Sequence, residues 1–437
     1  MDIRDALAKA TDGHADRVGD AEQVAGAPAS WPAQPSWPAQ PSWVARPGST
    51  DEVAEVLRVA AEHDLRVVAR GGGSKLDWGV PPERVDLIVD TSRLDRVVEH
   101  AAGDLVTVVE AGVRLSTLAE RLGAAGQRLA LDQTVPGATV GGTIATAASG
   151  PLRLLYGGVR DLVIGATLVR ADGAVTKSGG KVVKNVAGYD LGKLACGSYG
   201  TLGVVTQAAF RLHPVPPARA FVSLAVEDAA AAHAAVQRVL PGQVVPSAVE
   251  LDQPAAPRTA GERSAAAPGG TVTVLLEGIP EGVAARTRQA VELLGAGSTV
   301  ESDPPAGWGR HPAGPADLLA KLTTAVGGLR RLLDAVAQAA ADAGLPVAVR
   351  GSAGAGVLYA GVPAADAEPA AIARLVEALR RAGPSWSGSV VVLTAPAAVR
   401  AAVDMWGPVP GLELMRRVKD EFDPGHRLSP GRFVGGI

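Results

Sequence analysis

The sequence predicts an α+β protein with two domains and a short C-terminal segment. Three observations lead to this expectation. Strand and helix patterns alternate over residues 44–213, three closely spaced prolines (Pro214, Pro216 and Pro217) interrupt them, and the alternation resumes up to residue 405. The chain has 437 residues, which is more than a single core usually supports.

Composition excludes several classes of protein. Hydrophobic residues make up 47% of the chain, but aromatic residues only 3%, so the cores are expected to be mostly alanine, valine and leucine. The net charge is −3, with acids and bases interspersed, whereas a nucleic-acid binder usually shows a basic stripe. Cys196 is the only cysteine, which excludes an internal disulfide and a cysteine-based iron–sulfur or zinc site within this chain.

The N-terminal residues and the lengths of the apolar runs favour a cytoplasmic protein. Residues 1–10 carry four charges where a signal peptide needs an apolar stretch, and no run of about 18 apolar residues exists. Attachment at the inner face of the membrane would require a partner. Residues 1–43 are expected to form a Pro/Trp-rich tail, because residues 30–35 are nearly repeated at 36–41 and such prolines favour polyproline II. This tail is either a linker or a segment that docks in an aromatic-lined groove.

In the first domain, Ser49 or Thr50 is expected to cap a helix whose first turn holds Asp51 and Glu52. Apolar runs and periodicity predict the remaining elements. The expected strands are 65–69, 87–90, 106–110, 162–169 and 204–212, with a helix at 116–125.

The second domain, 214–405, is expected to be a sheet with helices packed on one face. Its expected strands are 221–226, 248–251, 272–277, 347–349, 356–361 and 390–393, and its expected helices are 229–239, 283–294, 329–343 and 370–381. An amphipathic helix at 411–422 follows in the last segment, 406–437, with Leu412, Met415, Val418 and Phe422 in one stripe.

Three patches of residues with little or no side chain mark a binding site for a large ligand. They are residues 70–74, 135–148 and 197–203. Such patches bury few methylenes, but their backbones can closely approach a ligand. Successive N–H groups of Gly71, Gly72 and Gly73 are suited to a pyrophosphate, with Arg70 and Lys75 adding positive charge. Neither a Rossmann fingerprint nor a phosphate-binding P-loop is present.

Five motifs resemble those of the vanillyl-alcohol oxidase or PCMH-type FAD-binding superfamily. The glycine loop 70–75, segment 135–145 and segment 199–206 resemble its three flavin-contact segments; residues 184–191 and the ending 422–432 resemble the glycolate oxidase and D-lactate dehydrogenase branch. Within this branch the chain is most similar to the FAD-binding subunit of glycolate oxidase, the E subunit. The resemblance implies a PCMH-type FAD-binding domain of two α+β subdomains at 44–213, an α+β cap domain at 214–405, and a C-terminal segment, 406–437, that returns to the FAD-binding domain.

The resemblance also implies which residues contact FAD. Residues 70–75 would hold the pyrophosphate, 136–142 would run along the ribityl chain and the flavin ring, 146–150 would lie near the adenosine half or ring edge, and 200–205 would close the far side. The implied contacts are Arg70, Gly71, Gly72, Gly73, Ser74, Lys75, Pro136, Gly137, Ala138, Thr139, Gly141, Gly142, Thr146, Ala148, Ser149, Gly150, Gly200, Thr201, Gly203 and Val205. Ser429 stands where the family often has asparagine.

FAD is expected to be non-covalent, because a covalent link in this fold usually uses a histidine in the pyrophosphate loop and this loop has none. The histidine cluster by which D-lactate relatives bind a metal and orient substrate is also absent, so no metal site and no catalytic residue is predicted. The expected partners are a homologous larger flavoprotein, an iron–sulfur subunit and a small 2-hydroxy acid. The alternatives are a self-sufficient FAD-dependent alcohol or hydroxy-acid oxidoreductase, and a non-catalytic assembly or regulatory module.

Overall fold

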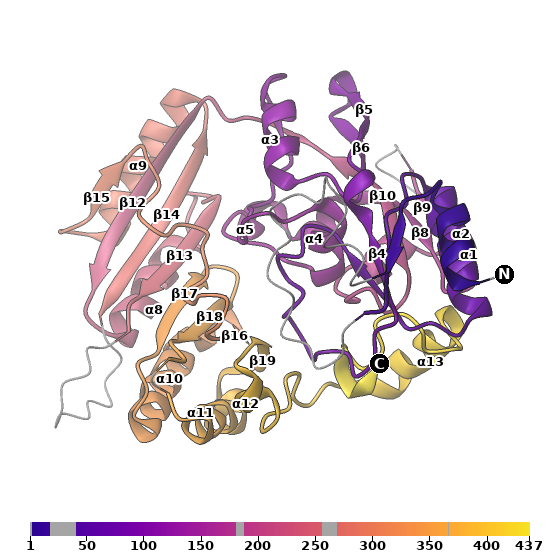
Figure 1. The fold of residues 1–437 in the computed structure, drawn as a ribbon. Helices are drawn as coiled ribbons and strands as arrows, with labels where there is room; N and C mark the ends of the chain where they lie inside the picture. The colour runs from indigo at the N-terminus through magenta and orange to yellow at the C-terminus, as the bar shows by residue number, and fades with distance from the viewer. Residues whose placement is uncertain (1, 18–40, 181–187, 256–268, 366) are drawn as a thin grey trace. The chain divides into compact units, whose positions relative to one another are not determined.

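The computed structural model describes residues 2–17, 41–180, 188–255, 269–365 and 367–437. It divides into two compact units (Figure 1). Unit 1 comprises Met1–Ala148, Gly158–Val215 and Pro408–Ile437, and unit 2 comprises Ser149–Gly157 and Pro216–Gly407. Each unit packs helices against β-sheet, which confirms the predicted α+β class.

Unit 1 contains two main sheets. The first has the order β1-β2-β4-β3, with β2, β4 and β3 parallel, and the second is antiparallel with the order β5-β6-β10-β8-β9. The short strands β7 and β11 pair separately. The bounds are β1 (Ala15–Arg17), β2 (Trp43–Ala45), β3 (Val67–Arg70), β4 (Leu87–Asp90), β5 (Val97–Ala101), β6 (Val106–Glu110), β7 (Gln127–Arg128), β8 (Val163–Val169), β9 (Val175–Gly179), β10 (Val204–Arg211) and β11 (His213–Pro214).

Helix α2 (Thr50–Glu62) shows how the sequence builds this unit. The hydroxyl of Ser49 accepts a hydrogen bond from the Glu52 N–H at 3.1 Å, so Ser49 is the N-cap. The apolar face of α2 joins the core formed by β2, β3 and β4. The other helices are α1 (Ile3–Ala10), α3 (Leu115–Gly123), α4 (Val140–Thr146), α6 (Val159–Leu162), α7 (Leu191–Ala195) and α13 (Leu412–Phe422).

The N-terminal residues differ from the predicted tail. Residues 3–10 form α1, and Leu7 is fully buried in the same core as α2. The argument against a helix rested on prolines, but residues 1–17 contain none, and Ile3, Leu7 and Ala10 follow helical spacing. A tail through residue 43 is therefore wrong for residues 3–17. The Trp-Pro repeat, except for its last residue, and the branch motif residues 184–187 lie outside the described residues.

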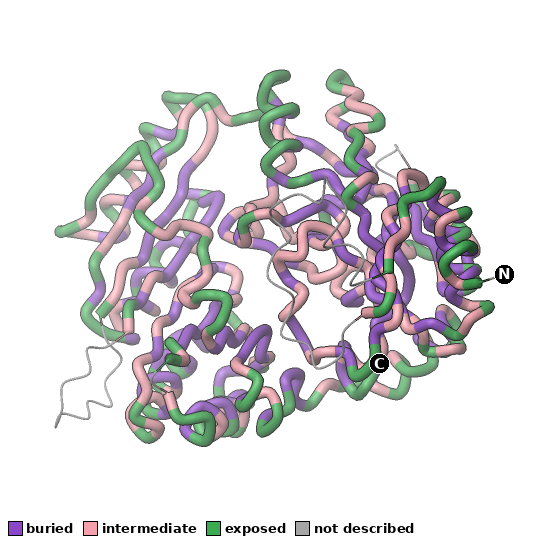
Figure 2. The backbone as a smooth tube through the Cα atoms, in the orientation of Figure 1, coloured by how far each residue is buried: buried purple, intermediate pink, exposed green. Residues whose placement is uncertain are grey.

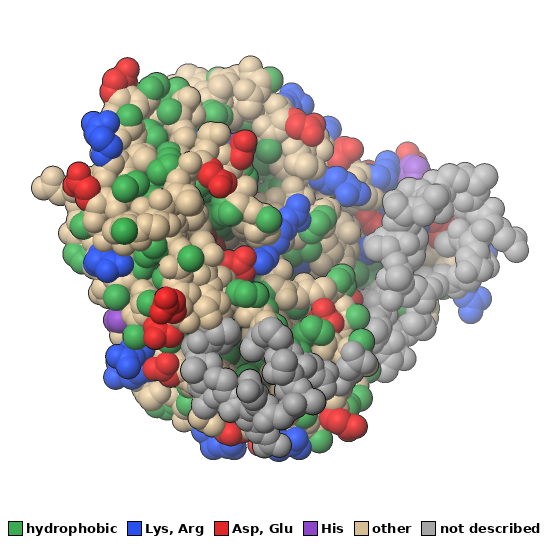
Figure 3. All heavy atoms as spheres, turned by 90° about the vertical axis from the view of Figure 1, so that its left-hand side faces the viewer, with side chains coloured by type: hydrophobic (Ala, Val, Ile, Leu, Met, Phe, Trp, Pro, Cys, Tyr) green, Lys and Arg blue, Asp and Glu red, His purple; other side chains and the backbone are tan. Residues whose placement is uncertain are grey.

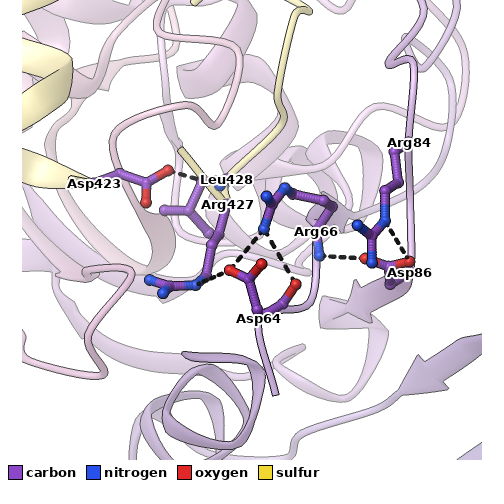
Figure 4. A network of polar contacts seen from close by, with 7 residues as sticks. All are labelled: Asp64, Arg66, Arg84, Asp86, Asp423, Arg427 and Leu428. Atoms are coloured by element: carbon purple, nitrogen blue, oxygen red, sulfur yellow. Dashed lines mark hydrogen bonds and ion pairs between the residues drawn. The ribbon is translucent and has the colours of Figure 1, made fainter. Parts of the chain in front are cut away.

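The C-terminal segment extends the first sheet of unit 1. Leu428 forms a parallel bridge with Val67, the Val67 N–H donates to Arg427 O at 2.8 Å, and the Ser429 N–H donates to Val67 O at 2.7 Å. Polar contacts continue outward along this edge (Figure 4): Arg427 pairs with Asp64 at 3.2 Å, and Asp64 pairs with Arg66 at 2.9 Å. The segment thus covers the edge of β3, directly before the glycine loop.

Unit 2 is an eight-stranded sheet with helices on one face. The strand order is β15-β12-β14-β13-β17-β18-β16-β19. The strands are β12 (Ala218–Val226), β13 (Ala248–Gln253), β14 (Gly270–Gly278), β15 (Thr299–Glu301), β16 (Leu318–Thr323), β17 (Ala348–Ser352), β18 (Val357–Val362) and β19 (Ser389–Thr394). The helices α8 (Ala229–Val239), α9 (Pro280–Leu294), α10 (Leu329–Ala343) and α11 (Pro369–Ala382) pack against it, and α12 (Ala397–Arg400) follows (Figure 1).

Burial in unit 2 follows this arrangement. Buried residues run along the strands, and the helices alternate between buried and exposed positions (Figure 2). On the face of the molecule drawn in Figure 3, acidic and basic side chains are interspersed, as the composition indicates. In the described residues, no helix is long and apolar enough to cross a membrane.

Several features of unit 2 were not predicted, among them β15, β16 and α12. Strand β16 was missed because its run Leu-Leu-Ala-Lys-Leu-Thr does not alternate strictly between apolar and polar residues. Residues 149–157, which were assigned to the FAD-binding domain, group with unit 2. Their helix α5 (Arg153–Tyr156) follows Leu152, which packs against Phe221, Ala248 and Leu275 of the sheet. This packing decides to which unit they belong.

Candidate functional site

A pocket in unit 1 brings together the three patches of small residues. Its empty volume, which includes space open to solvent, is about 760 Å³. The wall is formed by the loop after β3, one side of α4 and the loop that enters β10. The lining residues are Ala69, Arg70, Gly71, Gly72, Gly73, Ser74, Lys75, Leu76, Thr91, Ala111, Thr139, Gly141, Gly142, Ala145, Thr146, Ser198, Tyr199, Gly200, Gly203, Val204, Val205 and Arg432.

The loop after β3 supplies hydrogen-bond donors. In the part of the chain that the structure describes, the amide N–H groups of Gly72, Gly73, Ser74 and Lys75 have no hydrogen-bond acceptor. All four residues line the pocket. Consecutive backbone N–H groups without protein acceptors form a binding site for an anion, since such groups require a partner when a ligand displaces water.

Two buried cations flank these donors. Lys75 is 8% exposed, and burial lowers the pKa of its ammonium to about 8. Arg70 is 9% exposed, and burial likewise lowers the pKa of its guanidinium, against the opposing effect of Asp90. Within the described residues, Lys75 forms no ion pair or side-chain hydrogen bond. A buried positive charge of this kind favours an anionic ligand.

The first two patches pack so closely that only glycine fits. A Cβ atom on Gly71 would overlap the hydroxyl of Thr139, and one on Gly72 would overlap the carbonyl oxygen of Gly137. A Cβ on Gly141 would lie 2.8 Å from that of Ala111. These glycines therefore set the separation between the loop after β3 and the segment that leads into α4.

The segment 135–148, to which the sequence assigned no element, contains helix α4. Thr139 is its N-cap, and the Thr139 hydroxyl accepts a hydrogen bond from the Gly142 N–H at 3.4 Å. The Gly141 N–H donates to Ala111 O at 2.8 Å, which fixes this segment to the turn after β6. Thr139 was expected to contact the ligand, but its hydroxyl also caps a helix and leaves no room for a side chain at position 71.

The third patch is fixed from two sides. The N–H groups of Gly197 and Tyr199 donate to the carbonyls of Ile144 and Ala145 at 2.9 and 2.8 Å, which joins the patch to α4. From the other side, the buried Lys419 Nζ of α13 donates to Thr201 O at 2.8 Å. Tyr199 adopts a left-handed φ of 56°, a strained conformation for a tyrosine that the surrounding contacts must stabilise.

The structure separates the predicted contacts into two groups. Those that line the pocket are Arg70, Gly71, Gly72, Gly73, Ser74, Lys75, Thr139, Gly141, Gly142, Thr146, Gly200, Gly203 and Val205. Those outside its lining are Pro136, Gly137, Ala138, Ala148, Ser149, Gly150 and Thr201. Ser149 and Gly150 belong to unit 2. The carbonyl oxygen of Gly137 occupies the space that a side chain at position 72 would need. The carbonyl oxygen of Thr201 accepts a hydrogen bond from Lys419 Nζ.

Sequence reasoning missed Arg432, which lines the pocket from the C-terminal segment. It is 4% exposed, its Nη2 donates to Leu76 O and Trp78 O at 2.7 and 2.8 Å, and burial lowers its pKa to about 10. Arg432 belongs to the C-terminal motif 422–432, and this motif was the signal in the sequence that could have identified it. Ser429 is also buried, and its hydroxyl lies near Gly200.

Comparison with known proteins connects this architecture and pocket with FAD-linked oxidoreductases. Residues 41–179 match the FAD binding domain family, and residues 401–433 match the C-terminal domain of FAD linked oxidases. These two matches confirm the resemblance to FAD-linked oxidases. Solved p-cresol methylhydroxylase shares the fold, with a TM-score of 0.76 and 15% identity over 98% of this chain and 96% of that one.

The curated relatives include glycolate oxidase and D-lactate dehydrogenase proteins. The chain is 34% identical over 208 residues to glycolate oxidase subunit GlcD of Bacillus subtilis, covering 47% of this chain and 44% of that protein. It is 37% identical over 166 residues to D-lactate dehydrogenase of Archaeoglobus fulgidus, covering 38% and 37%. The chain therefore matches less than half the length of these relatives.

Charge on Lys75 is expected to make FAD affinity depend on pH. Below about pH 8 the ammonium attracts an anion, and above it the free protein loses this charge, so FAD affinity should fall as pH rises from 7 to 9. Lys75→Met should weaken binding roughly 10- to 100-fold at pH 7 and remove most of this dependence. FAD dissociation constants measured by fluorescence across this range, with Lys75→Arg as the charged control, test the prediction. A pH-independent constant for the wild type would contradict it.

The same lowered pKa has a consequence for stability. Between about pH 8 and 10.5 the unfolded chain binds a proton at Lys75 that the FAD-free folded chain does not bind. The free energy of unfolding of the FAD-free protein should therefore receive a contribution from Lys75 that increases with pH over this window.

Proposed function

We propose that this chain binds FAD non-covalently and serves as the FAD-binding subunit of a 2-hydroxy acid oxidoreductase of the glycolate oxidase or D-lactate dehydrogenase kind. The observation that carries the proposal is the row of N–H groups at residues 72–75, which have no acceptor in the described chain and line a glycine-rich pocket together with the buried Lys75 side chain. A dinucleotide pyrophosphate matches these donors in charge and in hydrogen bonding.

The residues of the pocket have separate roles in this proposal. The loop after β3 holds the pyrophosphate, Thr139 and the glycines of α4 form a wall close to the rest of the cofactor, and the loop around Gly200 closes the opposite side. Arg432 fixes the chain around Leu76 and Trp78. FAD would supply a two-electron acceptor for oxidation of the substrate hydroxyl.

Non-covalent attachment is supported by the residues around the pocket. In the described part of the chain, its lining includes no histidine and no cysteine. Cys196 lies outside the lining, and burial raises the pKa of its thiol to about 11, which keeps it protonated at neutral pH. We expect acid precipitation to release all of the yellow colour into the supernatant. Colour that remains in the pellet would show a covalent link.

Partners belong to the same proposal. The relative GlcD is a subunit of glycolate oxidase by name, and we propose that this chain works with a homologous larger flavoprotein and an iron–sulfur subunit. Its single cysteine cannot hold an iron–sulfur cluster, so electrons that leave the flavin would need another chain with such a cluster or a soluble acceptor.

Flavin absorbance tests the function. The purified chain, loaded with FAD, is mixed with glycolate or D-lactate without oxygen, first alone and then with the candidate partner subunits. Bleaching that requires the partners supports the subunit. Rapid bleaching by the chain alone would support the alternative of a self-sufficient oxidoreductase, and failure to take up FAD would support a non-catalytic module.

A further inference from the structure

The chain after α13 contacts one loop of the pocket through Arg432. The Nη2 atom of Arg432 donates to Leu76 O at 2.7 Å and to Trp78 O at 2.8 Å. The backbone adds a third hydrogen bond, in which the Val80 N–H donates to Arg432 O at 3.2 Å. These hydrogen bonds fix the part of the chain that directly follows the glycine loop 70–75.

The same segment also contacts the loop that enters β10. The ring of Phe433 stacks on that of Tyr199, with 5.7 Å between the centroids and 29° between the planes. A Cβ atom on Gly200 would lie 3.3 Å from the hydroxyl oxygen of Ser429. Both Tyr199 and Gly200 line the pocket. Arg432 and Phe433, which are neighbours in sequence, thus contact two different loops of one pocket.

These two loops belong to different sheets. The glycine loop follows β3 of the first sheet of unit 1, and the other loop leads into β10 of the second sheet. Helix α4 connects the loops once, because its N-cap Thr139 lies against Gly71 and the carbonyls of Ile144 and Ala145 accept hydrogen bonds from the third patch. The C-terminal segment connects them a second time. The contacts therefore form a closed circuit among the segments that line the pocket.

Two residues at the second connection have strained backbones. The φ angle is 56° at Tyr199 and 47° at Ser429, in the left-handed region that residues with a Cβ rarely adopt. Such conformations persist only where the surrounding contacts hold them. Toward the solvent, the segment is held by the ion pair of Arg427 with the exposed Asp64 (Figure 4), and exposed ion pairs stabilise little. Release of the segment would therefore relieve strain in the segment and in the loop together.

We propose that residues 424–433 form a clasp that holds the two loops of the pocket at a fixed separation, with Arg432 as a positioning residue. A ligand that contacts both loops binds the closed clasp more tightly than the open one, and by linkage it stabilises closure to the same extent. The identity of this ligand as FAD rests on the proposed function. The connection between the loops does not.

Hydrogen–deuterium exchange of the FAD-free protein, read by mass spectrometry, tests the connection. Arg432→Met should accelerate exchange roughly 10-fold in peptides that cover residues 76–80 and also in those that cover residues 197–203. Phe433→Leu should have the reciprocal effect, since it alters the contact with the second loop and should accelerate exchange at 76–80 as well. Arg432→Lys should change both regions less, and Arg417→Met, at an exposed arginine of α13, should change neither.

The same measurement with FAD tests the coupling. FAD should slow exchange at least about 10-fold at the N–H groups of Ser429 and Arg432, which donate to Val67 O and Ser429 O. Exchange in helix α10 of unit 2 should stay unchanged and serves as the internal reference. Arg432→Met should also raise the FAD dissociation constant roughly 10-fold, and Arg432→Lys should restore part of the affinity.

Three results would overturn the clasp. They are faster exchange confined to 76–80 in Arg432→Met, faster exchange confined to 197–203 in Phe433→Leu, and FAD that protects residues 70–75 without protecting Ser429 and Arg432. Circular dichroism checks the fold of both variants, and Phe433→Leu, which keeps an apolar side chain, decides the question if Arg432→Met does not fold. Failure of the wild type to take up FAD would contradict the proposed function alone, because the FAD-free comparison still decides whether the clasp connects the loops.

Discussion

Replacing Lys419 by methionine is expected to lower the free energy of unfolding by about 3–5 kcal/mol, the usual cost of removing one partner from a buried ion pair. Lys419 is completely buried, and its Nζ donates to Asp423 Oδ2 at 2.7 Å, Thr201 O at 2.8 Å and Leu428 O at 2.9 Å. Methionine would leave a buried carboxylate without its cation and two carbonyls without a donor. Burial lowers the pKa of Lys419, whereas Asp423 favours its charged form.

Denaturant unfolding of the FAD-free protein, followed by circular dichroism, measures this loss. Arg417→Met is the matched control, because Arg417 is exposed on the same helix and should change stability by less than about 0.5 kcal/mol. The double variant Lys419→Met/Asp423→Asn should recover part of the loss, since the unpaired charge is gone. Equal stability of the Lys419→Met and Arg417→Met variants would contradict the role of Lys419. FAD affinity should also fall, because Thr201 lies in the loop beside Gly200.

Gly72→Asp is expected to reduce FAD affinity by at least about 100-fold, through two effects. Any Cβ at this position overlaps the carbonyl oxygen of Gly137, so the loop after β3 and the segment before α4 must move apart. The new carboxylate would also face the row of N–H donors and the pyrophosphate that they are proposed to bind. Together these effects remove both the shape and the charge of the anion site.

Equilibrium dialysis with FAD measures this effect, and two further variants separate the causes. Gly72→Ala keeps the steric overlap without the charge, so it should bind FAD more weakly than the wild type but better than Gly72→Asp. Gly103→Asp adds the same carboxylate at a glycine of unit 1 with open space around it and should leave FAD binding unchanged. Unchanged flavin occupancy in Gly72→Asp would show that the pyrophosphate lies elsewhere.

Many elements were predictable because their signals are local. The bounds of β4, β6, α8 and α10 agree with the sequence prediction, since each has a clear apolar period or a capping residue such as Asp228. Elements were missed where the local sequence pattern was weak, or where another feature of the sequence was given more weight. Helix α1 was assigned to a tail on account of prolines that lie further along the chain, and β16 has no alternating pattern.

The sequence by itself predicted that a large ligand approaches the backbone of residues 70–74, 135–148 and 197–203, because these residues have few side-chain atoms to bury. Only the tertiary structure decided which of these residues line one pocket, and that Arg432 joins them. It also decided that Lys419 of the predicted amphipathic helix is buried. The physical reason is that a local pattern sets a residue's conformation, whereas its burial and its partner depend on distant segments that only the folded chain brings together.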